Sequence, residues 1–204
     1  MTIRHCLFAA ALCAAACTAP SVEAEQPDAR LTLDDVFDLS AKLRLKTQPQ
    51  GWFDSTRYLA VASDPADKQR KLLLVEASTG EAKPYFDAAQ MREAFGRVAG
   101  VDPKLAESWS KRTSFDMTGD KRGALINDAN DLYFYEFAAG KAARLTSDAR
   151  EEVGETLSPD GKWVGFIANW NLHVAPTDAS SPARALTTGG DENHLYGRLD
   201  WVYH

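Results

Sequence analysis

The chain has 204 residues, of which 45% are hydrophobic and 25% are charged, and its formal net charge is −6. This composition is that of a globular protein and argues against a disordered or collagen-like chain. A net acidic chain is poorly suited to the phosphate backbone of nucleic acids, so we expect no nucleic acid as its main partner.

Residues 1–24 have the features of an export signal. Arg4 provides a positive start, residues 6–17 are apolar and mostly small, and residues 22–24 offer a small-residue cleavage site. The apolar stretch is too short to span a bilayer, and we expect no transmembrane segment later in the chain. The sequence therefore predicts a signal peptide followed by a mature chain, residues 25–204, in the periplasm or outside the cell.

The same leader also resembles a bacterial lipoprotein signal. Ala14-Ala15-Ala16-Cys17 has the small residues of a lipoprotein cleavage box, in which Cys17 would carry the lipid, but the usual Leu three residues before the cysteine is missing. Simple cleavage is therefore the interpretation that we adopt, with lipid attachment as the alternative. All three cysteines lie in the leader, so we expect no disulfide within the mature chain.

The first elements expected in the mature chain are a short helix and a β segment. Residues 31–39 predict the helix, because Thr32 and Asp35 form a start that is similar to a capping box. Residues 54–81 predict a turn followed by short strands at 58–62 and 71–76.

An insertion at residues 87–111 has a helical pattern. Asp87 can cap a helix whose apolar residues are spaced by three or four, and Gly100 fits the end of that helix. Asp102-Pro103 then begins a second short helix, which runs to about Trp109. We interpret the insertion as an α-hairpin packed on the edge of a sheet; the alternative is a lid or a partner site.

The rest of the chain contains one β unit twice. In residues 155–187, a Ser-Pro-Asp-Gly-Lys turn precedes three short strands, expected at 163–168, 172–175 and 183–187. In residues 118–146, a Thr-Gly-Asp-Lys-Arg turn precedes three more, expected at 123–126, 132–137 and 143–146.

The two units recur in phase along the chain. Leu132 and Leu172 are 40 residues apart, and the pairs Leu145-Thr146 and Leu186-Thr187 are 41 residues apart. A period of about 40 residues with several short strands is typical of propeller blades. The sequence therefore predicts an all-β fold: a partial β-propeller of about three blades of antiparallel meanders, with a small helical insertion and a short N-terminal helix. The alternative is an ordinary β-sandwich.

The residues show no motif of a catalytic centre. A nucleophile elbow, a His-Glu-x-x-His motif, a Cys-x-x-Cys motif and a phosphate-binding loop are all missing from the sequence. His173 lies in a predicted strand, where we expect a packed or surface side chain. Asp191, Glu192, His194 and Asp200 match no metal-ligand spacing. We therefore expect no catalytic residues, no metal and no cofactor in this chain.

The C-terminal part resembles a known family. The segments LTTGGDEN at 186–193 and GRLDWVY at 197–203 follow a Ser-Pro-Asp-Gly-Lys blade. This arrangement looks like the propeller of the dipeptidyl peptidase IV group of the prolyl oligopeptidase family. The resemblance extends over residues 31–204, and its most specific part is Asp200-Trp201-Val202-Tyr203.

The resemblance implies a substrate-binding role for Asp200, Trp201 and Tyr203. In the family, this motif precedes acidic residues, the last two of which bind the free N-terminal ammonium of a peptide. Two carboxylates hold one ammonium strongly when all three groups are withdrawn from water. In this chain His204 stands where the first acid is usual. The family arginine near the substrate carbonyl is not assigned, because the alignment around Arg112 and Arg122 is ambiguous.

The resemblance also implies the partners and the activity. We expect the N-terminal propeller part of an exported serine peptidase that removes N-terminal dipeptides. Its partners in the intact enzyme would be the peptide substrate and a C-terminal α/β-hydrolase domain with the catalytic triad, and a homodimer is a compatible assembly. We expect the 204-residue chain alone to be inactive. The alternative function is a non-catalytic, TolB-like propeller that acts as a binding scaffold.

Overall fold

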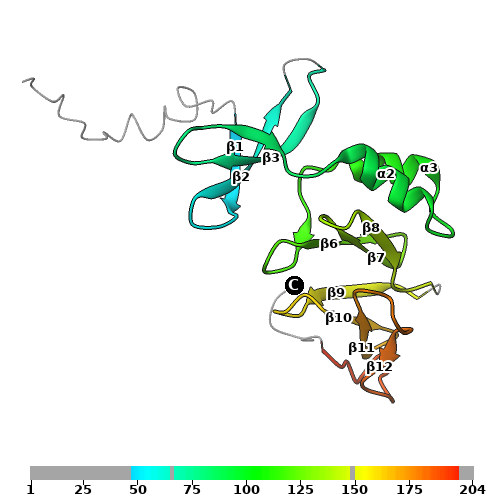
Figure 1. The fold of residues 1–204 in the computed structure, drawn as a ribbon. Coiled ribbons are helices and arrows are strands. Elements are labelled where there is room, and N and C mark those ends of the chain that lie inside the picture. Colours follow the sequence, from blue (N-terminus) through cyan, green and yellow to red (C-terminus); the bar gives the residue numbers. More distant parts are fainter. Residues whose placement is uncertain (1–46, 65–66, 148–149, 198–204) are drawn as a thin grey trace, which may run out of the picture. The chain divides into compact units, whose positions relative to one another are not determined.

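The computed structural model describes residues 47–64, 67–147 and 150–197, and it is mostly β. Three four-stranded antiparallel sheets follow one another along the chain, each with its strands in sequence order. Figure 1 shows this succession and the two helices between the first and second sheets. The expected helix at 31–39 and the leader lie outside the described residues.

The bounds of the strands agree closely with the expected units. The first sheet consists of β1 (Thr47–Trp52), β2 (Arg57–Ser63), β3 (Arg70–Glu76) and β4 (Ala82–Pro84). The second consists of β5 (Asp116–Met117), β6 (Gly123–Asp128), β7 (Asp131–Glu136) and β8 (Lys141–Arg144). The third consists of β9 (Glu152–Leu157), β10 (Trp163–Ala168), β11 (Asn171–Pro176) and β12 (Arg184–Ala185). Consecutive four-stranded meanders confirm the predicted fold class of partial propeller blades.

Four strands were not expected from the sequence: β1 and β4 of the first sheet, and the first strands of the second and third sheets, β5 and β9. β5 has only two residues, and β9 contains two glutamates and a glycine, so neither shows a hydrophobic strand pattern. These strands form because β6 and β10 offer them a free edge. β8 also begins two residues earlier than expected, at Lys141.

The recurring turn is held by one set of hydrogen bonds. Ser158 Oγ donates to Asp160 Oδ1 at 2.6 Å and accepts from Trp163 N at 3.0 Å, and Lys162 N donates to Asp160 Oδ1. Thr118, Asp120 and Gly123 repeat this pattern at the start of the second sheet. The hydrogen bond from Ser158, together with that from Lys162 N, holds the pKa of Asp160 below its ordinary value.

The recurring Leu-Thr pair closes each unit. Thr146 Oγ1 accepts from Leu132 N at 2.7 Å, and Thr187 Oγ1 accepts from Leu172 N at 2.9 Å. The backbone amides of Leu145 and Leu186 donate in turn to the carbonyls of those same leucines. The 40-residue period therefore reflects a repeated hydrogen bond. In each sheet it runs from a leucine amide to the hydroxyl of the threonine that follows the last strand.

The second and third sheets share a core between their facing surfaces. Leu125, Val164 and Phe166 are at most 4% exposed and belong to one hydrophobic cluster. The first sheet has a smaller cluster, built around Leu59 and Leu74, against which Phe115 and Met117 pack.

The two helices of the insertion begin where expected, but α2 ends at Gly96 rather than at Gly100, and the hairpin packs differently. Asp87 caps α2 (Ala88–Gly96) and Asp102 caps α3 (Pro103–Ser110), each through backbone amides of the first turn. The helices bury Phe95 and Trp109 against residues of the central strands of the second sheet, among them Ile126, Tyr133 and Tyr135. The hairpin therefore covers a face of the sheet, and the expectation that it packs on a sheet edge was wrong. The sequence could not distinguish a face from an edge, because it does not show which tyrosine side chains point toward the helices.

Arg144 is held within the second sheet, beside the loop that follows α2. Its Nη2 pairs with Asp131 Oδ2 at 2.6 Å, its Nε donates to the carbonyl of Thr146, and its guanidinium lies 5.9 Å from the ring centre of Tyr133. Gly100 has a φ of 84° and approaches so closely that a Cβ there would lie 2.8 Å from Arg144 Nη1. The positive φ, which other residues rarely adopt, explains the glycine between the two helices.

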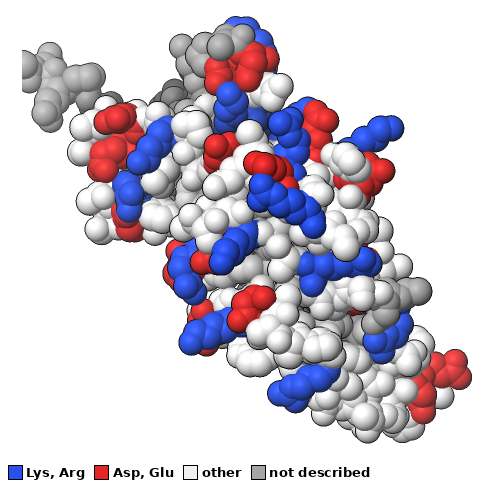
Figure 2. Space-filling model, turned by 45° about the vertical axis from the view of Figure 1, so that its right-hand side comes forward, with Lys and Arg blue, Asp and Glu red and all other residues white. Residues whose placement is uncertain are grey.

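Charged side chains are mixed over the surface. On the face that Figure 2 shows, Lys and Arg side chains alternate with Asp and Glu side chains. No helix in the described part of the chain is long and apolar enough to cross a membrane.

One hairpin suggests a stabilising substitution. Ala129 and Asn130 connect β6 to β7 with φ values of 51° and 67°, a two-residue turn that favours glycine. The free energy gained by relieving the left-handed strain at residue 129 exceeds the free-energy cost of the extra conformational entropy that glycine loses on folding. Ala129→Gly should therefore raise the free energy of unfolding by about 0.5–1 kcal/mol in urea denaturation. Ala139→Gly, at an exposed alanine without positive φ, is the control and should be neutral or destabilising; a gain there as large would contradict the explanation.

Candidate functional site

The residues proposed from the sequence to bind substrate lie outside the described residues. Asp200, Trp201 and Tyr203 follow Gly197, the last residue described, and Cys17 is in the leader. The structure describes instead the loop that leads to the motif, residues 186–197. We therefore built the site from this loop and from the hollows between the sheets.

The loop is anchored on the tip of the β10–β11 hairpin. Asn171 Oδ1 accepts from Gly190 N at 3.1 Å and from Thr187 Oγ1 at 3.3 Å, and Tyr196 N donates to the carbonyl of Trp170. A Cβ at Gly190 would lie 2.4 Å from the Trp170 carbonyl oxygen, so only glycine fits there. These contacts hold residues 187–196 against the tip of this hairpin.

Asp191 and His194 form a local pair within this loop. His194 Nδ1 lies 2.9 Å from Asp191 Oδ1, and both side chains are more than half exposed. The hydrogen bond from His194, then that from Asn193 N, lowers the pKa of the Asp191 carboxyl. Among the described residues, no three His, Cys, Asp or Glu side chains come close enough to hold a metal ion.

His173 is a packed histidine, as its position in a predicted strand indicated. Its side chain is 7% exposed and stacks on Phe166, with ring centres 5.4 Å apart and an interplanar angle of 18°. Nδ1 lies 2.9 Å from the carbonyl oxygen of Asn171. These contacts assign it to the core between the second and third sheets.

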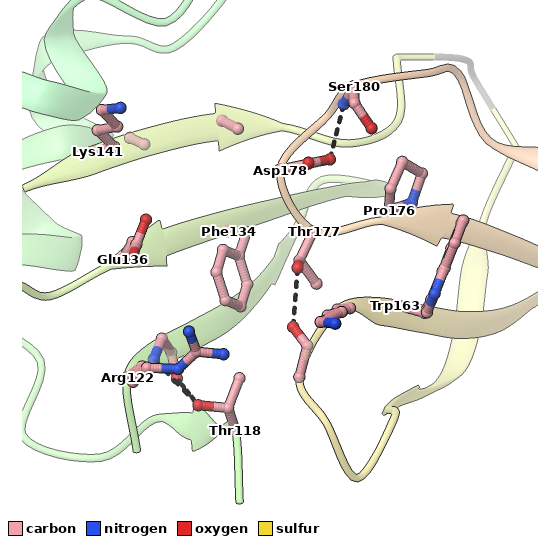
Figure 3. A pocket seen from close by; sticks show the side chains of 15 residues that line it. Thr118, Arg122, Phe134, Glu136, Lys141, Trp163, Pro176, Thr177, Asp178 and Ser180 are labelled. Carbon is pink, nitrogen blue, oxygen red and sulfur yellow. Dashed lines mark hydrogen bonds between the residues drawn. The ribbon is translucent and has the colours of Figure 1, made fainter. Parts of the chain in front are cut away.

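A groove of about 540 Å³ lies between the second and third sheets, at the end where both recurring turns occur. Phe134 of β7 points into it, between Thr118 and Arg122 of the second sheet and Thr177 of the third (Figure 3). The ring of Phe134 also lies against Gly123, where a Cβ would be 2.1 Å from Cζ.

The polar groups of this groove carry charges of both signs. Arg122, Lys141 and Lys162 bring positive charge, and Glu136 and Asp178 bring negative charge. Thr177 Oγ1 donates to the Gly161 carbonyl at 2.8 Å, and Thr118 Oγ1 donates to Asp120 Oδ1 at 2.7 Å. Both hydroxyls are therefore engaged in hydrogen bonds with the two recurring turns. The groove could accommodate a polar or peptidic ligand with charges of both signs.

The structure separates the two arginines that the sequence left unassigned. Arg122 lines the groove and pairs with Asp120. Arg112 lines another hollow, between the first sheet and the helices. The sequence analysis did not single out Phe134, Lys141 or Thr177, because they come from separate strands and follow no local motif.

Comparison with family models identifies the C-terminal part of the chain. Residues 128–204, less than half of the chain, match the model described as "Dipeptidyl peptidase IV (DPP IV) N-terminal region". This segment is a DPP IV-like N-terminal region. The match confirms the resemblance inferred from the sequence for residues 128–204, and it does not extend to residues 31–127. The matched residues include the third sheet, the anchored loop and residues 200–203.

Solved structures with a similar fold include two propeller proteins. No curated protein matches the DPP IV-like chain. Dipeptidyl peptidase 4 from Porphyromonas gingivalis is 15% identical, with a TM-score of 0.46, and the match covers 85% of this chain and 24% of that one. TolB from Acinetobacter baumannii is 19% identical, with a TM-score of 0.35, and the match covers 69% of this chain and 32% of that one. The chain thus spans less than one third of the length of either protein.

Proposed function

We propose that the chain is the N-terminal propeller part of an exported, DPP IV-like serine peptidase that removes dipeptides from the N-termini of peptides. In this proposal the propeller admits peptides and positions their N-termini, and an α/β-hydrolase domain performs the cleavage. The observation that carries the proposal is the match of residues 128–204 to the DPP IV N-terminal region.

The anchored loop supports a positioning role for the motif at 200–203. Asn171 and Trp170 hold residues 187–196 against the third sheet through several hydrogen bonds. A binding group that follows a fixed loop loses less conformational freedom when it contacts a ligand. We propose that Asp200, Trp201 and Tyr203 line the binding site for the peptide N-terminus.

The proposal predicts dipeptidyl peptidase activity that depends on this motif. The gene in its native context should give extracts that release chromophore from Gly-Pro-anilide, sensitive to a serine-directed inhibitor. Replacing Asp200 and Trp201 together with alanine should reduce kcat/KM at least about tenfold, mainly through KM, because binding is lost rather than chemistry. A matched Asp67→Ala, Trp52→Ala variant, at two exposed residues outside the groove and the anchored loop, is the control.

Two results would contradict this proposal. Unchanged activity in the Asp200, Trp201 variant would remove the positioning role. Extracts without inhibitor-sensitive activity that still contain the full-length gene product would favour the non-catalytic, TolB-like scaffold instead.

Export is a separate prediction. We expect residues 1–24 to be removed from the protein recovered from its native host, because they form a charged start, an apolar stretch and a cleavage site. Mass spectrometry of the N-terminus measures this directly. An exported protein that retains Met1 would contradict the prediction, and a lipid on Cys17 would establish the lipoprotein alternative.

A further inference from the structure

A second hollow, away from the groove and the anchored loop, has an unusual lining. It measures about 440 Å³ and lies between β3 and β4 of the first sheet and the ends of the helices. Leu72, Pro84 and Phe86 contribute apolar surface to it. Arg70, Lys71, Lys111 and Arg112 surround that surface with positive charge, in a chain whose net charge is negative.

Two of these four cations are already neutralised within the protein. Lys71 pairs with Asp64 at 2.6 Å and with Asp67 at 3.2 Å. Lys111 pairs with Glu107 at 2.6 Å. These two lysines therefore have carboxylate partners, and a ligand would gain less from them.

The two arginines are different. Arg70 Nη2 donates to the neutral amide oxygen of Gln48 at 2.6 Å, which leaves its charge uncompensated. The half-buried guanidinium of Arg112 has no hydrogen bond or ion pair with any residue in the described ranges 47–64, 67–147 and 150–197. The single acid of the lining, Asp87, is engaged with the amides of Ala89 and Gln90 at the start of α2.

This combination specifies the chemistry of a ligand. Guanidinium groups bind carboxylates in a planar, two-point geometry, and they do so more strongly where water is partly excluded. An apolar surface next to them favours an aliphatic or aromatic side chain. We propose that this hollow binds an acidic peptide segment in which an apolar side chain is flanked by Asp or Glu. This site goes beyond the proposed function and does not depend on it.

The test uses the 204-residue chain and a labelled peptide, fluorescein-Gly-Asp-Phe-Asp-Gly-amide. Because both ends of this peptide are blocked, a site for a free peptide N-terminus does not contribute to its binding. Fluorescence polarisation should show saturable binding that weakens between 50 and 200 mM salt. Arg112→Gln and Arg70→Gln should each weaken binding about tenfold, the loss expected for one charge-assisted contact.

Matched controls separate this site from general charge attraction. Arg92→Gln makes the same substitution on the exposed surface of α2, outside the hollow, and should leave the affinity unchanged. A peptide with Lys in place of both Asp residues, or with Ser in place of Phe, should bind at least about tenfold more weakly. Circular dichroism and urea unfolding verify that each variant is folded.

The proposal is overturned if the acidic peptide does not bind at low salt, or if Arg112→Gln and Arg92→Gln bind it equally well. Equal binding of the lysine peptide would overturn it as well. The outcome is distinct from that of the peptidase assay, since the blocked peptide cannot report on recognition of a free N-terminus.

Discussion

Trp109→Ala should lower the free energy of unfolding by about 3–5 kcal/mol, the usual cost of removing a large buried aromatic side chain. Trp109 is 1% exposed and lies between Phe95 and Tyr133, each with its ring centre 4.9 Å away. The substitution leaves a cavity between α3 and the second sheet, which close packing on both sides prevents from collapsing. Urea denaturation followed by circular dichroism measures the loss.

The matched control for this substitution is Trp52→Ala. Trp52 is 61% exposed and makes one edge contact with Tyr58, so its loss should cost under about 1 kcal/mol. If Trp109→Ala were as mild as the control, the helices would not be an integral part of the domain. The alternative interpretation of the insertion, as a lid, would then be favoured.

Gly123→Ala should destabilise the protein by about 1–3 kcal/mol through overpacking. The backbone of Gly123 does not require glycine; the conflict is with the ring of Phe134, whose Cζ would lie 2.1 Å from the added Cβ. The ring would have to leave its place beside the glycine and move within the groove that it helps to line. Urea denaturation measures the effect.

A double-mutant cycle makes this second prediction specific. Phe134→Ala removes the ring, so adding Gly123→Ala to it should cost much less than Gly123→Ala costs alone. Gly165→Ala is the control, because a Cβ there would have its nearest neighbours at 3.9 and 4.0 Å, an ordinary contact distance. Additive effects of the two substitutions at 123 and 134 would show that the ring does not occupy this position.

The sequence by itself determined the repeat and most of its strands. The turn residues Ser158-Pro159-Asp160-Gly161 and the pair Leu186-Thr187 act through hydrogen bonds within a few residues or to the adjacent strand. Such local bonds produce a fixed spacing that is visible in the chain. The caps Asp87 and Asp102 predicted the starts of both helices for the same reason.

Only the tertiary structure decided which surfaces meet. β5 and β9 are strands because a neighbouring strand offers its free edge, and their own residues carry little β preference. The helices lie on a face of the second sheet because Tyr133 and Tyr135 point toward them, while Phe134 between these residues points into the groove. The uncompensated charges of Arg70 and Arg112 likewise become visible only when segments 42 residues apart are brought to one hollow. Pairing across space depends on side-chain direction and distance, which a linear pattern does not contain.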